Sequence, residues 1–291
     1  MEYLLLAPNY GSGTVEVLTE ADLVAGGTPT SAWSTSSSNG YSGFAYGPDD
    51  RLYVADYSNN SIVVVDRDQM DASGSIVPAA VITNAGLSGA MGGGFDSNGS
   101  LWVGSYGSNV IYRFDGVTSA TGATDLAPAL TLSVDTGGGA LPFEFVYDVF
   151  VDHQDNVWVA DYDSGIYRFD SAGSLSGSAS ATPDLFLQEG LASTESNSGF
   201  ILYNPISVWV DQSGTLYAGS YFGTEVTRFD NALSMSGAPT GEASAYLNTG
   251  LSETSMVTLD ASGDLWVAHY DGELVELPNP STYSGAVNVS G

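Results

Sequence analysis

The sequence contains no lysine and no cysteine, and its five basic residues are all arginines. The absence of cysteine excludes disulfides and thiol chemistry. Against 34 acidic residues this leaves a formal net charge of −29, which should repel nucleic acid and anionic membranes. No apolar run approaches the ~20 residues of a membrane span, and the apolar stretch Tyr3 to Ala7 is too short for a signal peptide. We therefore predict no nucleic-acid partner and no membrane insertion.

Glycine and apolar residues, by contrast, are plentiful, with 36 glycines and 43% hydrophobic residues among 291. That combination favours many short strands joined by tight turns, in a chain long enough to bury a sizeable core. No run has the length and period of an amphipathic helix. The acidic surplus favours a solubility adaptation of a secreted, saline or virion protein, and divalent-cation binding is the alternative.

One unit recurs along the whole chain. It consists of a short apolar strand, a turn of the D-x-x-G kind, and a strand that reads L-[YW]-V or a close variant, as in Leu101-Trp102-Val103. The aromatic residues of this strand lie 49, 56, 59 and 49 residues apart, at Tyr53, Trp102, Trp158, Tyr217 and Trp266. This period is typical of the blades of a β-propeller.

The run from Leu52 to Asp66, LYVADYSNNSIVVVD, resembles an NHL repeat and the wider six-bladed group of gluconolactonase-like and TolB-like propellers. The resemblance covers nearly the whole chain. It implies an all-β, six-bladed β-propeller with four-stranded antiparallel blades, and a single domain over residues 1–291. The expected blade cores lie near 2–35, 42–83, 91–134, 146–188, 205–248 and 255–290.

The strand count predicts an incomplete ring. The first blade has no inner strand before Tyr3, and the last blade has at most a short outer strand, Ala286–Val289. An unclosed sheet would leave an open edge. We expect that the sequence is a piece of a longer protein, and the alternative is a strand donated by a neighbouring chain.

A repeated arginine predicts a structural brace. Arg113, Arg168 and Arg228 occupy one register, in Y-R-F-D or T-R-F-D. We expect them to join neighbouring blades by charge-assisted bonds, with Asp115, Asp170 and Asp230 as partners.

The sequence argues against an enzyme. The resemblance implies that enzymatic members carry metal ligands where the inner strands begin, but the residues there are poor ligands: Ser42, Met91, Tyr147, Ile206 and Ser255. One position later only Asp148 is a carboxylate, and a lone acid makes no catalytic site. Four aspartates of the D-x-x-G turns resemble calcium loops, but aspartate also satisfies turn amides. We predict no catalytic residue and no cofactor; calcium is left open, with Asp148 and Glu144 as its candidate ligands.

Two long loops indicate where a partner would bind. They run from Asp135 to Tyr147 and from Gln188 to Asn204, on the face where a tyrosine follows most of the L-[YW]-V strands. Long loops on a rigid scaffold often carry function, although these two could instead plug the tunnel mouth. The candidate binding residues are Phe143, Glu144, Phe145, Tyr147, Phe200, Tyr203, Tyr106, Tyr162 and Tyr221.

The leading hypothesis is a non-catalytic propeller that contacts a protein or a glycan on an extracellular, secreted or virion structure. Its partners could also be copies of itself or flanking segments of a longer chain. Two alternatives stay open: a calcium-dependent lactonase-like or lyase-like hydrolase, and a self-assembling spacer in an oligomer or filament.

Overall fold

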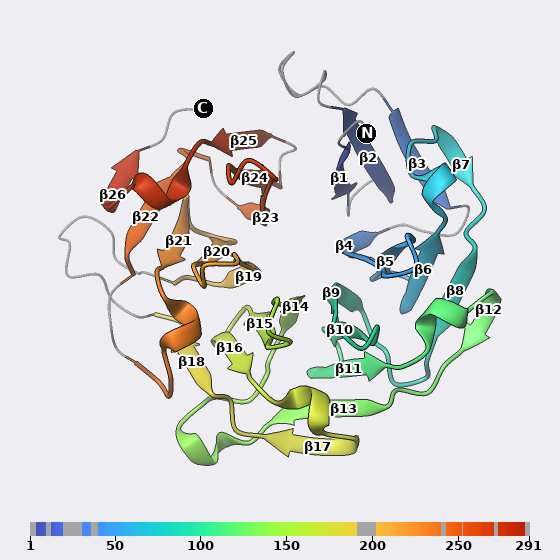
Figure 1. The fold of residues 1–291 in the computed structure, drawn as a ribbon, viewed down its shortest axis with the longest axis horizontal. Helices are drawn as coiled ribbons and strands as arrows, with labels where there is room; N and C mark the ends of the chain where they lie inside the picture. The colour runs from blue at the N-terminus through green and yellow to red at the C-terminus, as the bar shows by residue number, and fades with distance from the viewer. Residues whose placement is uncertain are drawn as a thin grey trace. The chain divides into compact units, whose positions relative to one another are not determined.

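A computed structural model describes residues 4–9, 13–19, 31–35, 40–190, 202–239, 243–251, 253–270 and 273–288. The chain forms two compact units, residues 1–131 and 132–291, and the boundary falls within strand β13. The described strands form six small sheets, the blades of an all-β propeller (Figure 1). The six-bladed fold that the repeat predicted is thus confirmed.

The first unit holds blades one and two and most of blade three. Blade one contains β1 (Leu4–Asn9), β2 (Thr14–Thr19) and β3 (Ser31–Thr35). Blade two contains β4 (Tyr41–Tyr46), β5 (Leu52–Asp56), β6 (Ser61–Val65) and β8 (Ala80–Thr83). Blade three contains β9 (Ala90–Phe95), β10 (Leu101–Ser105), β11 (Val110–Phe114) and the outer strand β13 (Leu130–Val134).

The second unit holds blades four, five and six. Blade four contains β14 (Val146–Val151), β15 (Val157–Asp161), β16 (Gly165–Phe169) and β18 (Leu185–Gln188). Blade five contains β19 (Pro205–Val210), β20 (Leu216–Ser220), β21 (Glu225–Phe229) and β22 (Ala245–Asn248). Blade six contains β23 (Thr254–Leu259), β24 (Leu265–His269) and β25 (Leu274–Leu277).

The second strands of blades two to five are buried along their whole length, because both of their faces are covered. All five residues of β5 and of β15 are buried, which is why these strands are so rich in valine, alanine and aromatic residues. Trp33, Trp102 and Trp158 are completely buried. The cores lie between successive blades within each unit; one of them packs Trp158 against Phe229 and Tyr246 of blade five.

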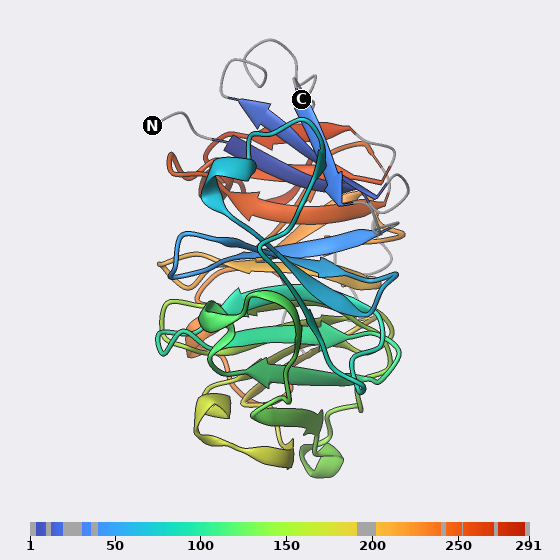
Figure 2. The ribbon, with the colours of Figure 1, turned by 90° about the vertical axis from the view of Figure 1, so that its right-hand side faces the viewer.

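Four short strands from the linkers add an outer edge to the preceding blade. They are β7 (Gly74–Ile76), β12 (Gly122–Asp125), β17 (Gly177–Ala181) and β26 (Gly285–Asn288). Three of them pair in parallel: β7 with β3, β12 with β8 and β26 with β22. Figure 2 views β7 and β12 at the outer side of the first unit. The sequence had suggested purely antiparallel blades. The parallel pairs show that the blades with an added strand are mixed sheets.

Each of the four added strands begins at a left-handed glycine that follows a 3₁₀ turn, and Gly237 holds the same position in the linker of blade five. Besides η3 (Thr136–Gly138), the 3₁₀ turns are η1 (Arg67–Gln69), η2 (Val117–Ser119), η4 (Ala172–Ser174), η5 (Ala232–Ser234) and η6 (Pro280–Thr282). Gly177, Gly237 and Gly285 have φ values of 69°, 69° and 68°, which a side chain would disfavour. In the described part of the chain, no helix is long and apolar enough to cross a bilayer.

Blades one and six differ from the others as the strand count predicted, with one correction. Because β7 pairs with β3 as β12 pairs with β8, β3 is the outer strand of blade one, and no described strand lies inside β1. The segment Ala286–Val289 was predicted to be the outer strand of blade six. That prediction was wrong: β26 pairs with β22 of blade five, which leaves three described strands in blade six.

Candidate binding surface

The tyrosine that follows the second strand of a blade is fixed by the loop that enters the inner strand. In the second unit the backbone N–H groups of Tyr162, Tyr221 and Tyr270 donate to the carbonyls of Phe145, Asn204 and Glu253, at 2.9, 3.0 and 2.9 Å. The first unit repeats this geometry at Tyr57 and Tyr106, whose rings lie 5.7 Å apart. The repeat therefore places one tyrosine beside the entering loop in each of blades two to six, and the loops of blades four and five are those predicted to carry function.

In the second unit these rings form a continuous row. Ring centroids are 5.5 Å apart for Tyr147 and Tyr162, 5.9 Å for Tyr162 and Tyr221, and 5.5 Å for Tyr221 and Tyr270. Phe222 contacts Tyr162, Tyr203 and Tyr221. We call this set the aromatic surface; it comprises Phe145, Tyr147, Tyr162, Tyr203, Tyr221, Phe222 and Tyr270.

Three members of the aromatic surface expose much of their side chains. The exposed fraction is 56% for Phe222, 46% for Tyr270 and 38% for Tyr203. Soluble proteins rarely expose contiguous aromatic residues without a use, whereas single exposed apolar residues are ordinary. Here Phe222 contacts Tyr203, and the partly buried Tyr221 contacts both Phe222 and Tyr270, so the surface has the composition of a contact site.

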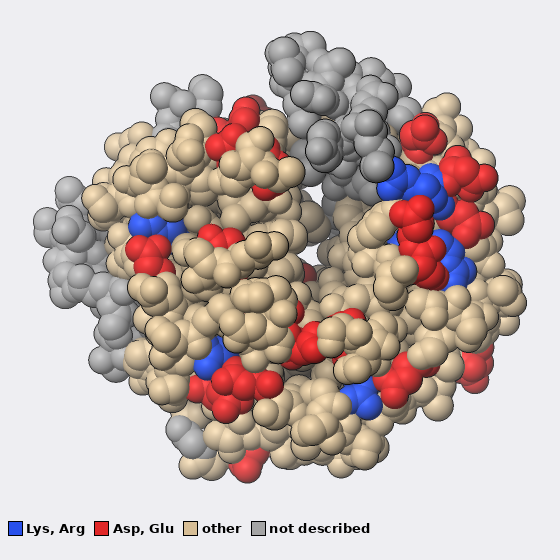
Figure 3. Space-filling model, viewed as in Figure 1, with Lys and Arg blue, Asp and Glu red and all other residues tan. Residues whose placement is uncertain are grey.

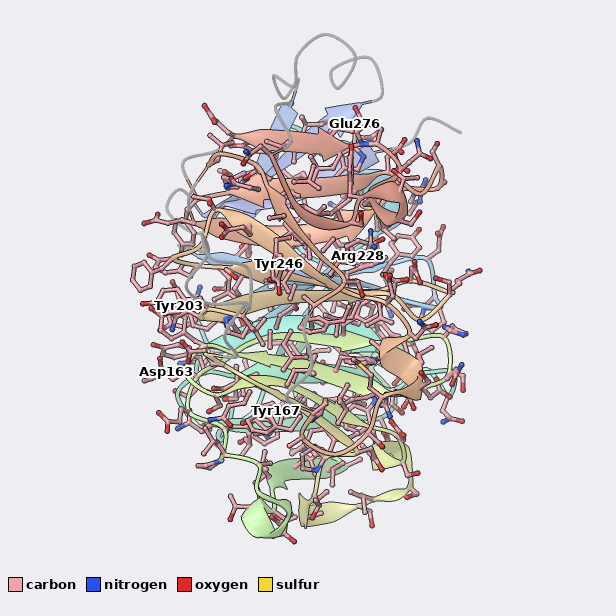
Figure 4. All side chains as sticks on the ribbon, turned by 90° about the vertical axis from the view of Figure 1, so that its left-hand side faces the viewer. Asp163, Tyr167, Tyr203, Arg228, Tyr246 and Glu276 are labelled. Atoms are coloured by element: carbon pink, nitrogen blue, oxygen red, sulfur yellow. The ribbon has the colours of Figure 1, made fainter. Side chains whose placement is uncertain are left out.

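Carboxylates and an amide border this surface. Asn204, held at a positive φ of 46°, donates from its Nδ2 to the carbonyl of Tyr162 at 3.0 Å and to Asp163 Oδ1 at 3.4 Å. Its backbone N–H donates to Glu189 Oε1 at 3.4 Å. Burial, and then the charge of Asp163, raise the pKa of Glu189. Figure 4 shows Tyr203 and Asp163 along one edge of the molecule, away from Arg228 and Glu276.

Polar side chains of blade four hold the first long loop by hydrogen bonds to its backbone. Asp161 Oδ2 accepts from the backbone N–H groups of Glu144 and Phe145, at 2.9 and 3.0 Å. Ser164 Oγ donates to the carbonyl of Pro142 at 2.9 Å. Burial raises the pKa of Asp161 to about 6. The loop thus holds a defined shape, with Phe145 on the aromatic surface.

The predicted binding residues do not all lie together. Phe145, Tyr147, Tyr162, Tyr203 and Tyr221 belong to the aromatic surface, and the Glu144 side chain is exposed beside Phe145. Phe143, however, is only 5% exposed and packs on Tyr167 and Phe169, so it is a core residue. Tyr106 belongs to the first unit, and Phe200 lies outside the described residues.

Phe222 was missed by the sequence argument, and Tyr270 was recognised only as a member of the repeat. The available signal for Phe222 was its position directly after Tyr221, where the other blades have no second aromatic residue. The position of Tyr270 was visible in the repeat, but its exposure follows from its place in blade six.

Asp148, the candidate metal ligand, joins two inner strands. Its Oδ2 accepts from the backbone N–H of Val208 at 3.0 Å, and burial raises its pKa to about 6. Ser207 repeats the contact one blade on, where its Oγ accepts from Val257 N at 3.0 Å. The pairing shifts register just before each of these two residues. Such bulges re-aim side chains, and here they direct the next residue at the neighbouring blade.

Acidic side chains meet elsewhere, in blade six. Among the described residues, one set of at least three acidic or histidine side chains places its ligand atoms within 4.8 Å of one another: Asp260, Asp264 and Glu276. Asp260 already accepts from the backbone N–H groups of Ser262 and Asp264 and from the Trp266 indole, at 2.8, 3.0 and 3.1 Å. Asp148 and Glu144 belong to no such set in the described chain. Calcium binding at these two residues stays a prediction.

The turn aspartates act on the turns that carry them. Asp96 and Asp152 accept from the indoles of Trp102 and Trp158 at 3.0 and 2.7 Å, as well as from turn amides. Asp211, whose blade has Tyr217 instead of tryptophan, accepts only from the turn in the same way. These bonds explain why aspartate stands six residues before Trp102, Trp158 and Trp266.

The repeated arginines brace neighbouring blades. Arg168 pairs with Asp170 at 2.5 Å and donates to the carbonyls of Ala232 and Met235 at 2.7 and 3.0 Å. Arg228 pairs with Asp230 at 2.9 Å and donates to the carbonyl of Pro280. In Figure 3 the blue arginine surfaces border red acidic ones. Arg113 pairs with Asp115 at 3.0 Å, as predicted, and lies over the Trp102 ring.

No protein family and no curated protein matches the sequence, but solved structures match the fold. The chain is similar to virginiamycin B lyase from Staphylococcus aureus, with a TM-score of 0.54, 12% identity, and coverage of 99% of this chain and 89% of that one. It is also similar to an extracellular domain of a one-component system from B. thetaiotaomicron, with a TM-score of 0.56, 17% identity, and coverage of 97% of this chain and 35% of that one. For the WD40 propeller domain of Doa1 the TM-score is 0.57 and the identity 10%, over 94% of this chain and 88% of that one. At these identities the likeness defines the class, a β-propeller, and no activity.

Proposed function

We propose that this chain is a non-catalytic binding module, and that its aromatic surface contacts a protein segment with basic side chains. The observation that carries the proposal is the row of neighbouring rings beside Asp163 and Glu189, of which Tyr203, Phe222 and Tyr270 are exposed. Aromatic faces and carboxylates both attract guanidinium and ammonium groups. The net charge of −29 would in addition steer a basic partner toward the module.

A glycan is the competing ligand, since sugars also stack on aromatic rings. The carboxylates that border the rings favour the basic protein segment, because a neutral sugar can donate hydrogen bonds to them but forms no ion pair with them. The proposed setting is an extracellular, secreted or virion surface. The structural neighbour from B. thetaiotaomicron supports it as an extracellular domain, and labelling of intact cells or particles with an antibody tests it.

Fluorescence titration with an arginine-glycine octapeptide, beside a panel of neutral and acidic glycans, tests the ligand class. We expect the peptide to bind in a salt-sensitive manner. Tyr203→Ala and Phe222→Ala should each weaken binding by about tenfold, the equivalent of ~1.4 kcal/mol. Tyr46→Ala is the matched control, because Tyr46 is 49% exposed but lies outside the aromatic surface.

Two outcomes would overturn the proposal. One is peptide binding that Tyr203→Ala and Phe222→Ala leave unchanged. The other is a neutral glycan that binds through Tyr203 and Phe222 while the basic peptide does not.

A further inference from the structure

The outer edge of β25 differs from the same edge in the neighbouring blades. In blades four and five the residue before the outer strand donates its N–H to the carbonyl of the repeated arginine: Asp184 to Arg168 at 2.8 Å, and Ser244 to Arg228 at 2.7 Å. In β25 the position of the repeated arginine is occupied by Glu276, because Glu276 pairs with Trp266 as Arg228 pairs with Tyr217. In the described part of the chain, no strand lies on this side of β25.

The backbone of β25 presents hydrogen-bonding groups at this edge. In an antiparallel ladder, alternate residues direct both their N–H and their C=O to the same side. His269 N donates to the carbonyl of Glu273 at 2.9 Å, so residues 273, 275 and 277 face β24. Leu274 and Glu276 therefore direct their backbone groups outward, where the outer strand lies in blades four and five.

Side-chain burial shows what the outer strand covers elsewhere. The equivalents of Leu274 are Ile166 and Val226, which are both completely buried, whereas Leu274 is only partly buried. Arg168 and Arg228 are each 3% exposed, whereas Glu276 is exposed. An apolar side chain and a row of strand amides are thus accessible together, which is the combination that strand addition uses.

The chain's own outer strands define what fits beside such an edge. Read in the direction of pairing they are Ala80-Val81-Ile82-Thr83, Leu185-Phe186-Leu187-Gln188 and Ala245-Tyr246-Leu247-Asn248. The third residue is isoleucine or leucine each time, is at most 1% exposed, and pairs with the equivalent of Leu274. The fourth residue is polar each time.

Charge and backbone chemistry specify the residue that precedes the strand. Ser244 Oγ and Asp184 Oδ2 accept from the backbone N–H groups of Asp230 and Asp170, both at 2.8 Å. Blade six has Pro278 at that position, which has no N–H to satisfy. In blade six, the carboxylates of Glu276, Asp264 and Asp260 lie close together. In the residue that precedes an added strand, a basic side chain would therefore be more favourable than an acceptor such as Ser244 or Asp184.

We propose that β25 binds an extended peptide segment of a partner protein by strand addition. The segment runs antiparallel to β25 and reads basic, small or apolar, bulky, Leu or Ile, polar. Its basic residue lies near Glu276, and its Leu or Ile covers Leu274. This interaction uses residues outside the aromatic surface, whose Tyr203 lies away from Glu276 (Figure 4).

The probe is the octapeptide AKAYLNTG, which is the sequence of residues 243–250 with lysine in place of Ser244. Calorimetry on the full chain should show saturable binding of one peptide, and a scrambled peptide should not bind. Glu276→Pro removes an outward N–H without touching the bonds to β24, since edge strands tolerate proline. It should weaken binding by more than about tenfold, or ~1.4 kcal/mol. Glu276→Ala keeps the N–H and should weaken binding less.

Circular dichroism melting of each variant checks that Glu276→Pro folds as the parent does. Absence of saturable binding to the parent chain overturns the proposal, as does equal affinity of the proline and alanine variants. Self-association that Glu276→Pro abolishes, measured by light scattering, would identify a second copy as the occupant and overturn the choice of a separate partner. Tyr203→Ala should leave AKAYLNTG binding unchanged, so failure here is distinct from failure of the basic-segment proposal.

Discussion

Blades five and six are built on the same repeat, yet one position of the repeat is a buried arginine in blade five and an exposed glutamate in blade six. In blade five, Arg228 is buried under an outer strand and donates to the Pro280 carbonyl of the next linker. In blade six the same register holds Glu276, which is exposed beside Asp260 and Asp264. The comparison teaches that the arginine belongs to the packing between a blade, its outer strand and the following linker. A carboxylate is tolerated where the described chain provides no such cover.

The largest expected effect breaks this comparison directly. Arg228→Met removes the donor to Pro280 and leaves Asp230 without its cation, so we expect a loss of about 2–4 kcal/mol in the free energy of unfolding. Asp230 is 43% exposed, which keeps the value below that of a fully buried pair. Glu276→Met at the equivalent position should change stability by no more than about 0.5 kcal/mol. Urea unfolding of both variants measures this, and equal losses would refute the comparison.

The next effect concerns the hydrogen bond from Val208 to Asp148, which joins the inner strands of blades four and five. Burial holds the pKa of Asp148 at about 6, above its unfolded value. The native state therefore retains a proton that the unfolded state releases, and stability falls as pH rises from about 4 to above 6. Asp148→Asn keeps an oxygen acceptor for Val208 and should abolish this contribution, with a gain on the order of 2 kcal/mol at pH 7.

Thermal unfolding of Asp148→Asn and the parent from pH 4 to 7 measures the difference. Ser207, which forms the equivalent contact between blades five and six, also hydrogen-bonds to Asp148 and lowers its pKa. Ser207→Ala should therefore raise that pKa and extend the fall in stability to higher pH. Parallel pH profiles for the parent and Asp148→Asn would contradict the assignment.

The smallest effect compares the tryptophan turns of blades four and six. Trp158 is completely buried and donates to Asp152 at 2.7 Å, whereas Trp266 is partly buried and donates to Asp260 at 3.1 Å. Trp158→Phe should cost about 1–2 kcal/mol, because the buried Asp152 Oδ2 loses its indole donor and keeps only the amide of Asn156. Trp266→Phe should cost less, since water replaces the indole. Urea unfolding with tyrosine fluorescence gives both values, and a larger loss at Trp266 would reverse the order.

Much of the fold was predictable because its signals are local. The aromatic spacing of the repeat marked five blades, the resemblance to six-bladed propellers implied the sixth, and alternation as in Leu101-Trp102-Val103 predicted their strands. The arginine–aspartate partners followed from a separation of two residues in one strand. The tyrosine row was predictable as a register, since equivalent residues of a repeat occupy equivalent places.

Other features were hidden because they depend on contacts between distant residues. The serine-glycine linkers gave no strand signal for β12 and β17, and the sequence placed the strand near Ala286 in blade six, whereas β26 pairs with the free edge of β22. Phe143 reads like its neighbour Phe145, but the fastened loop directs one to the core and the other to the surface. The bulges at Asp148 and Ser207 likewise follow from pairing.

The sequence by itself therefore determined the blade, its repeat and its internal bonds, because period-two alternation and turn chemistry act over a few residues. Only the tertiary structure decided which aromatic rings are exposed together, what Asp148 contacts and which edge of blade six is left accessible. Those properties depend on which segments, far apart in the chain, lie beside one another, and a residue's identity does not encode its neighbours.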